Sequence, residues 1–286
     1  MALVTNAKIL NKAYKNKYAV GAFNFSTMEI FHGITRAALK LKSPIILASS
    51  KGELSFFGAE YMAAVAEKFS NIAKIPVSMH LDHGPDFETV KQCIKAGYSS
   101  VHIDNSSLPM KDNIRNTKKA VNYAHKKGIS VEGEIGHVAG SSKLNKQEIN
   151  IDKDLLTRLE DAVEYVEKTG VDMLAVAIGN AHGVYKSSPK LDFKILHEIS
   201  KKIKIPLVLH GGSGISNQQI RKAVSLGIAK VNVNTENRIA FADKVRENLK
   251  QSPKEIVPYK MFKDCSLAVQ KIVEKKIKLF GSVNKA

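Results

Sequence analysis

The fold is indicated most clearly by a stretch that reads DFETVKQCIKAGYSSVHID, residues 86–104. Its first eleven residues space their apolar side chains as an amphipathic helix does, Gly97 follows, and a run containing β-branched residues comes next. The same order returns at 159–178, around Gly170, and at 220–233, around Gly227. Helices that alternate with short apolar strands are typical of βα units and a parallel sheet.

Eight strands can be counted along the chain, and eight parallel strands are the number that closes a (β/α)₈, or TIM, barrel. We therefore predict an α/β protein with one barrel domain over residues 1–286. A doubly wound open sheet stays possible, because periodicity does not show closure. Lys186–Phe193 is expected to be a loop, and the tail Gln251–Ala286 to add terminal helices. The expected strands are Tyr18–Phe23, Pro44–Ala48, Pro76–Leu81, Ser99–Asp104, Ile129–Glu134, Asp172–Ile178, Ile205–His210 and Ile228–Val233.

The composition is that of an ordinary globular protein. The 286 residues are 44% hydrophobic and 25% charged, and no apolar run approaches the roughly 20 residues that span a bilayer. The first ten residues lack a basic region followed by a long apolar stretch, so no secretory signal is expected and a cytoplasmic protein is predicted. Cys93 and Cys265 belong to no CxxC pair and are expected to be structural.

The formal net charge is +17, and it comes mainly from scattered lysines. Proteins that bind nucleic acid more often show a basic stripe with interleaved aromatic residues or a reading motif, and neither is present. Nucleic-acid binding is therefore not expected as the main function, although a non-enzymatic basic surface-binding protein stays a distant alternative. A positive field would favour a small polyanionic substrate.

Three histidines follow predicted strands, at His83, His182 and His210. The carboxyl ends of barrel strands meet on one face, where the loops build the active site. Three protein ligands with one open position are typical of a catalytic zinc site, so the trio predicts a divalent-cation site. A single strand-end histidine is more often a hydrogen-bonded structural residue. The other histidines fit this pattern less well: His32, His80, His102, His125, His137 and His197.

Acidic residues stand beside these histidines. Asp82 could exchange a proton with a reacting oxygen next to the metal, or it could instead orient a ligand histidine. Asp104 and Glu134 end neighbouring strands and could share a second cation, although buried partners of nearby lysines would look the same.

Glycine-rich and polar turns follow the last two strands. Gly211-Gly212-Ser213-Gly214 comes after the seventh, and Asn232–Thr235 closes the eighth. Barrel enzymes commonly bind phosphate there through backbone N–H groups, which glycine lets an anion approach closely. We therefore predict a phosphate site at these turns.

Taken in order, these motifs resemble class II, metal-dependent fructose-1,6-bisphosphate aldolases over nearly the whole chain. The family also includes tagatose-bisphosphate aldolases. The matching segments are Tyr18–Asn24, Leu81–Gly84, Val131–Gly136, Gly179–Gly183, Leu209–Gly214 and Lys230–Asn237.

The resemblance implies a role for each matched residue. His83, His182 and His210 would bind catalytic Zn²⁺, Asp82 would be the proton donor, and Asp104 and Glu134 would bind a second divalent metal. The metal would act as a Lewis acid that stabilises the enediolate of dihydroxyacetone phosphate, in place of a lysine Schiff base. The implied substrate contacts are Ser50 for the aldehyde and Gly183, Gly211, Gly212, Ser213, Asn232, Val233, Asn234 and Thr235 for dihydroxyacetone phosphate.

The implied reaction is reversible cleavage of fructose 1,6-bisphosphate to dihydroxyacetone phosphate and glyceraldehyde 3-phosphate, a step of glycolysis. Asn234 and Asn237 favour the fructose branch, since tagatose enzymes tend to carry alanine and leucine at these positions. The tagatose ester stays an alternative because it differs only in one hydroxyl configuration. A homodimer or homotetramer and a monovalent cation are also implied.

The chain departs from the family at the loop after Glu134. The family usually places there the acid that removes a proton from the bound ketone, and this chain has Ser142 at that position. Glu148 is the nearest glutamate downstream, and it is either the loop base or an exposed loop residue.

Overall fold

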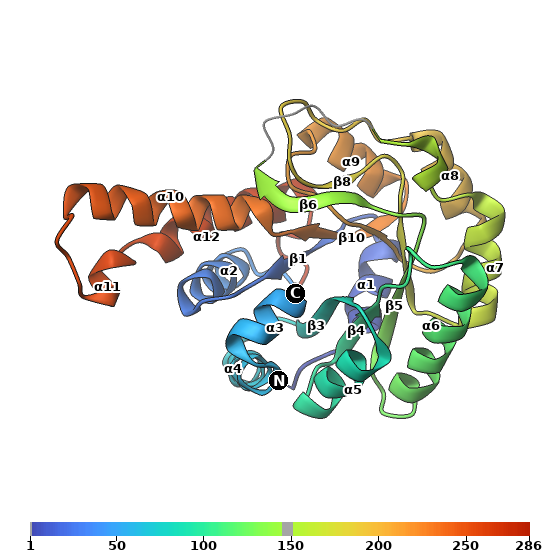
Figure 1. Ribbon diagram of the computed structural model, residues 1–286, viewed down its shortest axis with the longest axis horizontal. Helices are drawn as coiled ribbons and strands as arrows, with labels where there is room; N and C mark the ends of the chain where they lie inside the picture. Colours follow the sequence, from blue (N-terminus) through green and yellow to red (C-terminus); the bar gives the residue numbers. More distant parts are fainter. Residues whose placement is uncertain (1, 145–150) are drawn as a thin grey trace.

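A closed barrel of eight parallel strands forms the centre of the protein (Figure 1). The computed structural model describes residues 2–144 and 151–286. Around the barrel the strands follow the order β1, β10, β9, β7, β5, β4, β3, β2, so the predicted (β/α)₈ barrel is confirmed and the open sheet is excluded. The strands are β1 (Val20–Asn24), β2 (Ile45–Ser49), β3 (Val77–Gly84), β4 (Ser100–Ile103), β5 (Ser130–Ile135), β7 (Met173–Val176), β9 (Leu207–Leu209) and β10 (Ile228–Val233).

Helices surround the barrel on the outside, as the connections between parallel strands require (Figure 1). Among the helices of the described residues, none is both long and apolar enough to cross a membrane. The helices that precede the C-terminal arm are α1 (Asn6–Lys15), α2 (Met28–Lys40), α3 (Lys51–Phe57), α4 (Ala59–Ile72), α5 (Phe87–Ala96), α6 (Met110–His125), α7 (Leu159–Thr169), α8 (Phe193–Lys202) and α9 (Asn217–Ser225), with a 3₁₀ turn at Lys153–Leu155.

The stretch 86–104 forms its helix and strand for local reasons. Asp86 caps the start of α5, because its side chain accepts a hydrogen bond from the Thr89 backbone N–H at 2.8 Å. Gly97 ends the helix in the left-handed conformation, at φ 105°. The strand β4 follows at once and is buried along its length.

One end of the barrel is filled by apolar side chains. Ile9, Leu10 and Ala13 of α1 pack against inward-facing residues of the strands, such as Ile46 and Met173. Burying a side chain of this kind stabilises the fold by about 1.5–3 kcal/mol. The polar residues predicted to act are therefore gathered at the opposite, carboxyl end of the strands.

A small second sheet differs from the prediction. The segment expected to be a loop after Glu134 forms β6 (Ala139–Leu144), which pairs in parallel with β8 (Ala181–Val184). The residues of β6 show no apolar alternation, so no strand was expected there. The loop expected at Lys186–Phe193 is confirmed, and α8 begins at its last residue.

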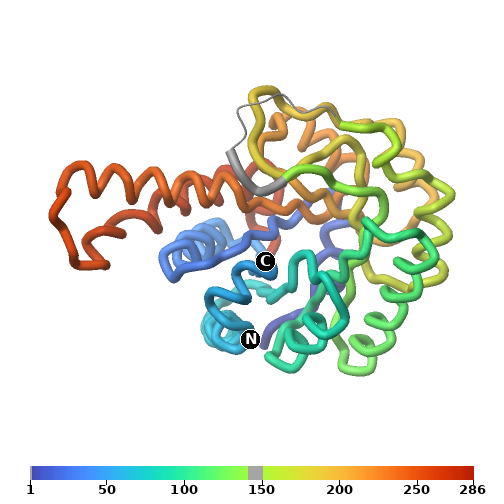
Figure 2. Tube along the Cα trace, in the orientation of Figure 1, coloured from blue at the N-terminus to red at the C-terminus, as the bar shows by residue number. Residues whose placement is uncertain are grey.

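The C-terminal residues form helices, as predicted, and make an arm that extends beyond the barrel (Figure 2). Its helices are α10 (Thr235–Gln251), α11 (Pro258–Met261) and α12 (Cys265–Phe280). Buried Val269, Val273 and Ile277 of α12 join the core cluster that also contains Ile34 of α2. The base of the arm is therefore packed on the barrel, and α10 starts directly at the functional end of β10.

Candidate metal and substrate site

The three predicted histidines meet at the carboxyl end of the barrel. His83 is the last residue but one of β3, His182 lies in β8, and His210 follows β9. The ring centroids of His83 and His210 are 4.4 Å apart, those of His83 and His182 are 4.9 Å apart, and those of His182 and His210 are 6.1 Å apart. Residues that lie up to 127 positions apart in sequence are thus brought to one place.

His210 is held in one orientation by a buried carboxylate. Its Nε2 donates to Glu132 Oε1 at 2.8 Å, and Glu132 Oε2 accepts from Lys230 Nζ at 2.7 Å. The other ring nitrogen, Nδ1, lies 3.9 Å from Asp82 Oδ1. Burial lowers the pKa of His210 well below its ordinary value, so the ring is neutral and Nδ1 carries a lone pair.

His83 has an unusual backbone and a crowded ring. Its φ is 49°, a left-handed conformation that costs a residue other than glycine about 1–3 kcal/mol and clusters at functional sites. Its Nδ1 donates to Asp104 Oδ2 at 2.6 Å. Burial alone would lower the pKa of His83, but the charge of Asp82, the hydrogen bond to Asp104 and the charge of Glu134 raise it to about 10. The site therefore attracts positive charge.

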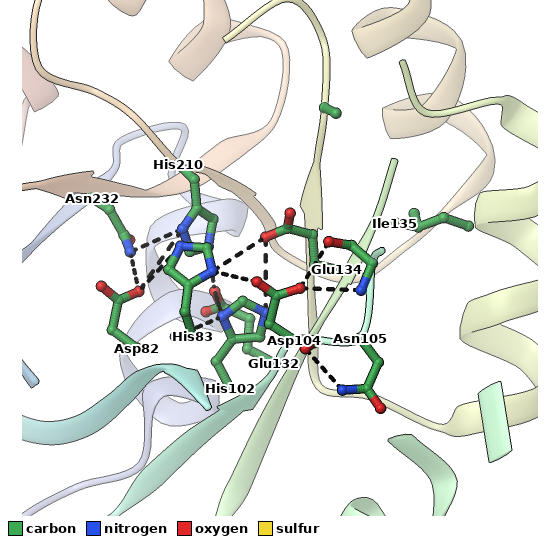
Figure 3. Close-up of polar contacts among 12 residues, drawn as sticks. Asp82, His83, His102, Asp104, Asn105, Glu132, Glu134, Ile135, His210 and Asn232 are labelled. Carbon is green, nitrogen blue, oxygen red and sulfur yellow. Dashed lines mark hydrogen bonds and ion pairs between the residues drawn. The ribbon is translucent and has the colours of Figure 1, made fainter. Parts of the chain in front are cut away.

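The two acids expected to share a second cation also come together. Glu134 Oε2 lies 4.0 Å from His83 Nδ1 and 3.9 Å from His102 Nε2, and Asp104 is held by the hydroxyl of Ser106 at 2.8 Å (Figure 3). Burial, followed by the charge of Asp104, raises the pKa of Glu134 to about 8. Among the described residues, both acids form ion pairs with histidines, whereas the carboxylate of this cluster that pairs with a lysine is that of Glu132.

The donor set fits divalent cations. One ligand atom from each of Asp82, His83, His102 and His210 lies within 4.8 Å of the others, and the same holds for His83, His102, Asp104 and Glu134. His83 Nε2, His102 Nε2 and Glu134 Oε2 are buried with no hydrogen-bond partner. Buried polar atoms are rarely left unpaired, and a cation in the cluster would give these three atoms a partner. Imidazole suits zinc and carboxylates suit harder ions.

His102 and Glu132 were not expected at the centre of the site. Both lie inside strands that are buried on both faces, where no polar alternation shows which side chains point inward. His102 Nδ1 accepts the backbone N–H of His83 at 3.2 Å and so supports the strained turn. The available signal was an ionisable side chain within a strand predicted to be buried.

Asp82 lies between two asparagine amides. Asn24 Nδ2 donates to its Oδ2 at 3.0 Å, and Asn232 Nδ2 donates to its Oδ1 at 2.8 Å. Burial would raise the pKa of Asp82, but electrostatic interactions with His83, His210 and Lys230 and the hydrogen bond from Asn24 lower it below its ordinary value. Asp82 is therefore ionised at neutral pH and able to accept a proton.

A cavity of about 200 Å³ opens over Asp82, His83 and His182. On one side it meets the start of α10, whose cap residue Asn234 makes no side-chain capping bond. In the first turn the Glu236 N–H donates to Ser213 Oγ at 3.3 Å, whereas the N–H groups of Thr235 and Asn237 are left uncapped by Asn234. The predicted substrate residues that line it are Ser50, Gly183, Gly211, Ser213, Asn232, Asn234 and Thr235.

Two predicted substrate residues lie behind the wall of this cavity. The backbone N–H of Gly212 donates to the Asn232 carbonyl at 2.9 Å, and Val233 is fully buried in β10. Ser142 lies in β6, and Glu148 lies outside the described residues. The cavity wall also contains Asn24, which ends the matching segment Tyr18–Asn24 but was given no role, and Arg238, which lies one residue beyond the segment Lys230–Asn237.

Comparisons with known proteins agree with this geometry. The family model for class II fructose-bisphosphate aldolase matches residues 4–285. The fructose-bisphosphate aldolases of Staphylococcus aureus (strain Mu50) and Geobacillus stearothermophilus are 41% and 42% identical to the chain, and the alignments cover 100% of this chain and 100% and 99% of those proteins. The crystal structure of the YdjI aldolase from Escherichia coli K12 has a TM-score of 0.86 at 35% identity, with 99% of each chain covered.

Proposed function

The chain belongs to the class II fructose-bisphosphate aldolase family, and we propose that it cleaves fructose 1,6-bisphosphate reversibly to dihydroxyacetone phosphate and glyceraldehyde 3-phosphate. The observation that carries this proposal is the meeting of Asp82, His83 and His182 at one cavity, with buried His210 packed against His83. The family match over residues 4–285 supports aldol cleavage as the reaction that these four residues would catalyse.

We propose Zn²⁺ as the catalytic metal, held by His83, His182 and His210. Three imidazoles with one open position suit zinc, and the orientation of His210 by Glu132 is the support that zinc ligands commonly have. The bound metal would supply Lewis-acid polarisation of the ketone and stabilise the enediolate. Asp104 and Glu134 are the proposed ligands of a second divalent cation. The proposed monovalent cation has no assigned ligands.

Asp82 is the proposed group for proton transfer at the aldehyde oxygen. In cleavage its ionised carboxylate takes the proton of the C4 hydroxyl, the C3–C4 bond breaks, and the aldehyde carbonyl forms. In condensation the protonated acid returns that proton to the aldehyde oxygen. Asn24 and Asn232 hold the two carboxylate oxygens in place for this transfer.

The phosphate of dihydroxyacetone phosphate is proposed to bind at the α10 side of the cavity. Gly211, Ser213 and Thr235 line the wall there, and the first turn of α10 offers backbone N–H groups and the positive end of its dipole. Glu236 lies close by, but Lys276 Nζ donates to its carboxylate at 2.6 Å and compensates its charge.

Glu148 stays the proposed base that removes a proton from the bound ketone. It is the nearest glutamate downstream of Ser142, the position where the family resemblance places an acid. The test is exchange of the carbon-bound hydrogen of dihydroxyacetone phosphate with deuterated solvent. Glu148→Gln should abolish that exchange while metal content stays normal, and unchanged exchange would remove Glu148 from the mechanism.

Tagatose 1,6-bisphosphate is the alternative substrate. Asn234 lines the cavity and Asn237 is fully buried just behind it, at two positions that distinguish the branches in the family resemblance, and both favour fructose. The decisive experiment is a steady-state comparison of the two sugar bisphosphates with metal analysis on the same sample. A higher kcat/KM for the tagatose ester would overturn the substrate assignment.

We propose that the protein acts as a homodimer or homotetramer. Ile256 and Tyr259 near the tip of the arm are 84% and 77% exposed, and a second subunit packed on the arm would cover them. Sedimentation equilibrium tests the proposal, which a monomer at micromolar concentration would contradict.

A further inference from the structure

Another cavity lies at the end of the barrel opposite the metal site, and its volume is about 240 Å³. Pro44 and Pro76 directly precede β2 and β3 and line it at the amino ends of these strands. None of the described residues that line it also lines the cavity over Asp82. The two cavities are therefore separate sites at opposite ends of the barrel.

The inner wall of this second cavity is apolar and preformed. Ile9 and Tyr18 are 4% and 3% exposed, and Pro44 is buried with them. Val4 is held in place because its backbone N–H donates to the Val77 carbonyl at 2.9 Å. A proline has a fixed φ, so this part of the wall is stiff. The apolar body of a small ligand would leave water on entering such a cavity, which favours binding.

Three lysines border the cavity. Lys8 and Lys12 lie one turn apart in α1, and Lys285 belongs to the C-terminal tail. Lys12 Nζ donates to the Lys285 backbone carbonyl at 3.1 Å, which joins the helix to the tail beside the cavity. Lys285 Nζ lies 5.6 Å from the centroid of the Tyr18 ring. The ammonium groups are thus gathered around one apolar hollow.

No acid balances these lysines. Among the described residues that line the cavity, none is an aspartate or a glutamate. The described acids that form ion pairs do so with other basic residues or with histidines, and none pairs with Lys8, Lys12 or Lys285. Positive charge without a partner favours an anion. An inorganic anion would make no use of the apolar wall, so the ligand that fits both features is organic.

The hydroxyl of Tyr18 also lacks a partner. It is buried and makes no hydrogen bond within the described part of the chain. Burial raises the pKa of Tyr18, so the phenol keeps its proton at neutral pH and remains a donor. Buried polar atoms are seldom unpaired, and an oxygen acceptor of a ligand beside Tyr18 would supply the missing bond.

We propose that this cavity binds a small organic anion, a carboxylate with an apolar chain or ring. Its apolar body would lie against Ile9, Pro44 and Pro76, and its carboxylate would meet the lysines at the rim. Charge-assisted hydrogen bonds from lysine to carboxylate are stronger than neutral ones, so they would favour the anion over an uncharged molecule of the same shape. The inference is independent of the aldolase function, because the metal site uses none of these residues.

Calorimetric titration of the full chain with three ligands tests the charge and the apolar body separately. Octanoate has both features, octanamide has the chain without the charge, and acetate has the charge without the chain. Octanoate should saturate a single site, octanamide should bind about 10-fold more weakly, and acetate should not saturate over the same range. Equal affinities for octanoate and octanamide, or no binding of octanoate, would overturn the proposal.

Methyl NMR locates the bound ligand. Octanoate should shift the methyl signals of Val4 and Ile9 with the dissociation constant that calorimetry gives. The methyl signals of Ile256, which is 84% exposed on the arm, should stay in place. Shifts confined to methyl groups away from Val4 and Ile9 would show that octanoate binds elsewhere, and the proposal would fail.

Substitution of the lysines tests whether the rim recognises the carboxylate. Lys8→Gln combined with Lys12→Gln should weaken octanoate binding about 3- to 10-fold and leave octanamide within about 2-fold. The matched control is Lys118→Gln combined with Lys271→Gln, which removes the same charge from exposed positions that line neither cavity. An equal loss in the control would show attraction to the overall net charge and would contradict a defined site.

A second copy of the chain is the other occupant that the titration distinguishes. Octanoate should bind with the same affinity at every protein concentration if the cavity is open to small ligands. An affinity that falls as the protein concentration rises would show that another subunit covers the cavity. That result would overturn the proposal and assign this end of the barrel to subunit contact.

Discussion

His210 donates its Nε2 proton to Glu132 at 2.8 Å, and this one bond decides which nitrogen of the ring faces the metal site. Glu132 is fully buried and carries its charge because Lys230 compensates it at 2.7 Å. Burial alone would raise the pKa of Glu132, but the charge of Lys230 and electrostatic interactions with His80 and His102 lower it to about 2. Buried Lys230 thus keeps Glu132 ionised, and Glu132 in turn orients the proposed metal ligand His210.

Removing that lysine should destabilise the fold and loosen the metal. Lys230→Met leaves the charge of Glu132 buried and unpaired, which costs about 3–5 kcal/mol. Urea denaturation measures the loss in free energy of unfolding. The control is Lys168→Met, which breaks the exposed pair with Glu164 and should cost less than about 1 kcal/mol. Combining Lys230→Met with Glu132→Gln should recover part of the loss, and no recovery would contradict this account.

The ion pair of Lys230 and Glu132 also predicts how the stability of the fold depends on pH. The pKa of Glu132 is about 2 in the folded protein against an ordinary 4.5. A carboxyl group whose pKa is lower in the folded than in the unfolded protein stabilises the fold. This contribution is complete above pH 4.5 and is lost as the pH falls through about 2. In Lys230→Met the free energy of unfolding should therefore fall less steeply as the pH is lowered. Urea denaturation between pH 5 and pH 3 measures this slope. An unchanged slope would show that Lys230 does not depress the Glu132 pKa.

The barrel and its histidines could be predicted because their signals are local. Each unit of helix, glycine and strand is readable within about 20 residues, as at 86–104, and parallel strands bring their carboxyl ends together whatever the distance in sequence. This rule alone was enough to predict that His83, His182 and His210 lie close together. The motif resemblance then supplied the reaction.

The residues that support the site carried no such signal. Glu132 and Lys230 lie within buried strands, and their pairing depends on which strands face each other across the barrel. Arg238 in the cavity wall pairs with Glu53 of α3, and the two residues are 185 positions apart. Contacts of this kind are set by tertiary geometry, which periodicity does not report. The strand β6 escaped prediction because its partner, β8, is also remote.

Removing the metal should abolish activity. Dialysis against a chelator should stop fructose-bisphosphate cleavage, and added Zn²⁺ or Co²⁺ should restore it, because the three imidazoles and the nearby acids form a donor set that suits a divalent cation. A coupled assay for dihydroxyacetone phosphate measures both steps. His182→Ala should lose metal under the same dialysis conditions in which the unmodified protein retains it. Full activity in a preparation shown to be metal-free would sink the metal-dependent mechanism.

Metal binding should release protons. In the metal-free protein the pKa of His83 is raised to about 10, so its ring is protonated at pH 8, whereas the pKa of His182 is lowered to about 4 and that ring is already neutral. A ligand histidine must lose its proton, so about one proton should leave His83 for each ion bound, and apparent affinity should rise with pH. Calorimetry of Zn²⁺ binding in two buffers of different ionisation enthalpy counts the protons. His83→Gln should release fewer, and an equal number would contradict the assignment.

Asp82 should matter to turnover more than to metal content. Asp82→Ala should lower kcat by about 10²- to 10⁴-fold, the usual contribution of a positioned acid or base. Its carboxylate is 3.9 Å from both His83 Nε2 and His210 Nδ1, so metal analysis must accompany the kinetics. Retained metal with slow turnover supports proton transfer. Lost metal would show instead that Asp82 helps to hold the ion.

Gly211 tests the phosphate side of the cavity. Its φ is 65°, and an added Cβ would overlap the carbonyl group of Ala181, which is backbone and cannot turn away. Gly211→Ala should therefore cost about 1–3 kcal/mol through overpacking, with about 1 kcal/mol more for the left-handed backbone. KM for the sugar bisphosphate should also rise, because Gly211 lines the cavity. Gly128→Ala isolates the backbone cost, since Gly128 has a φ of 70° and open space around its Cβ position. Equal losses of stability in the two variants, with KM unchanged in Gly211→Ala, would show that this turn does not shape the phosphate site.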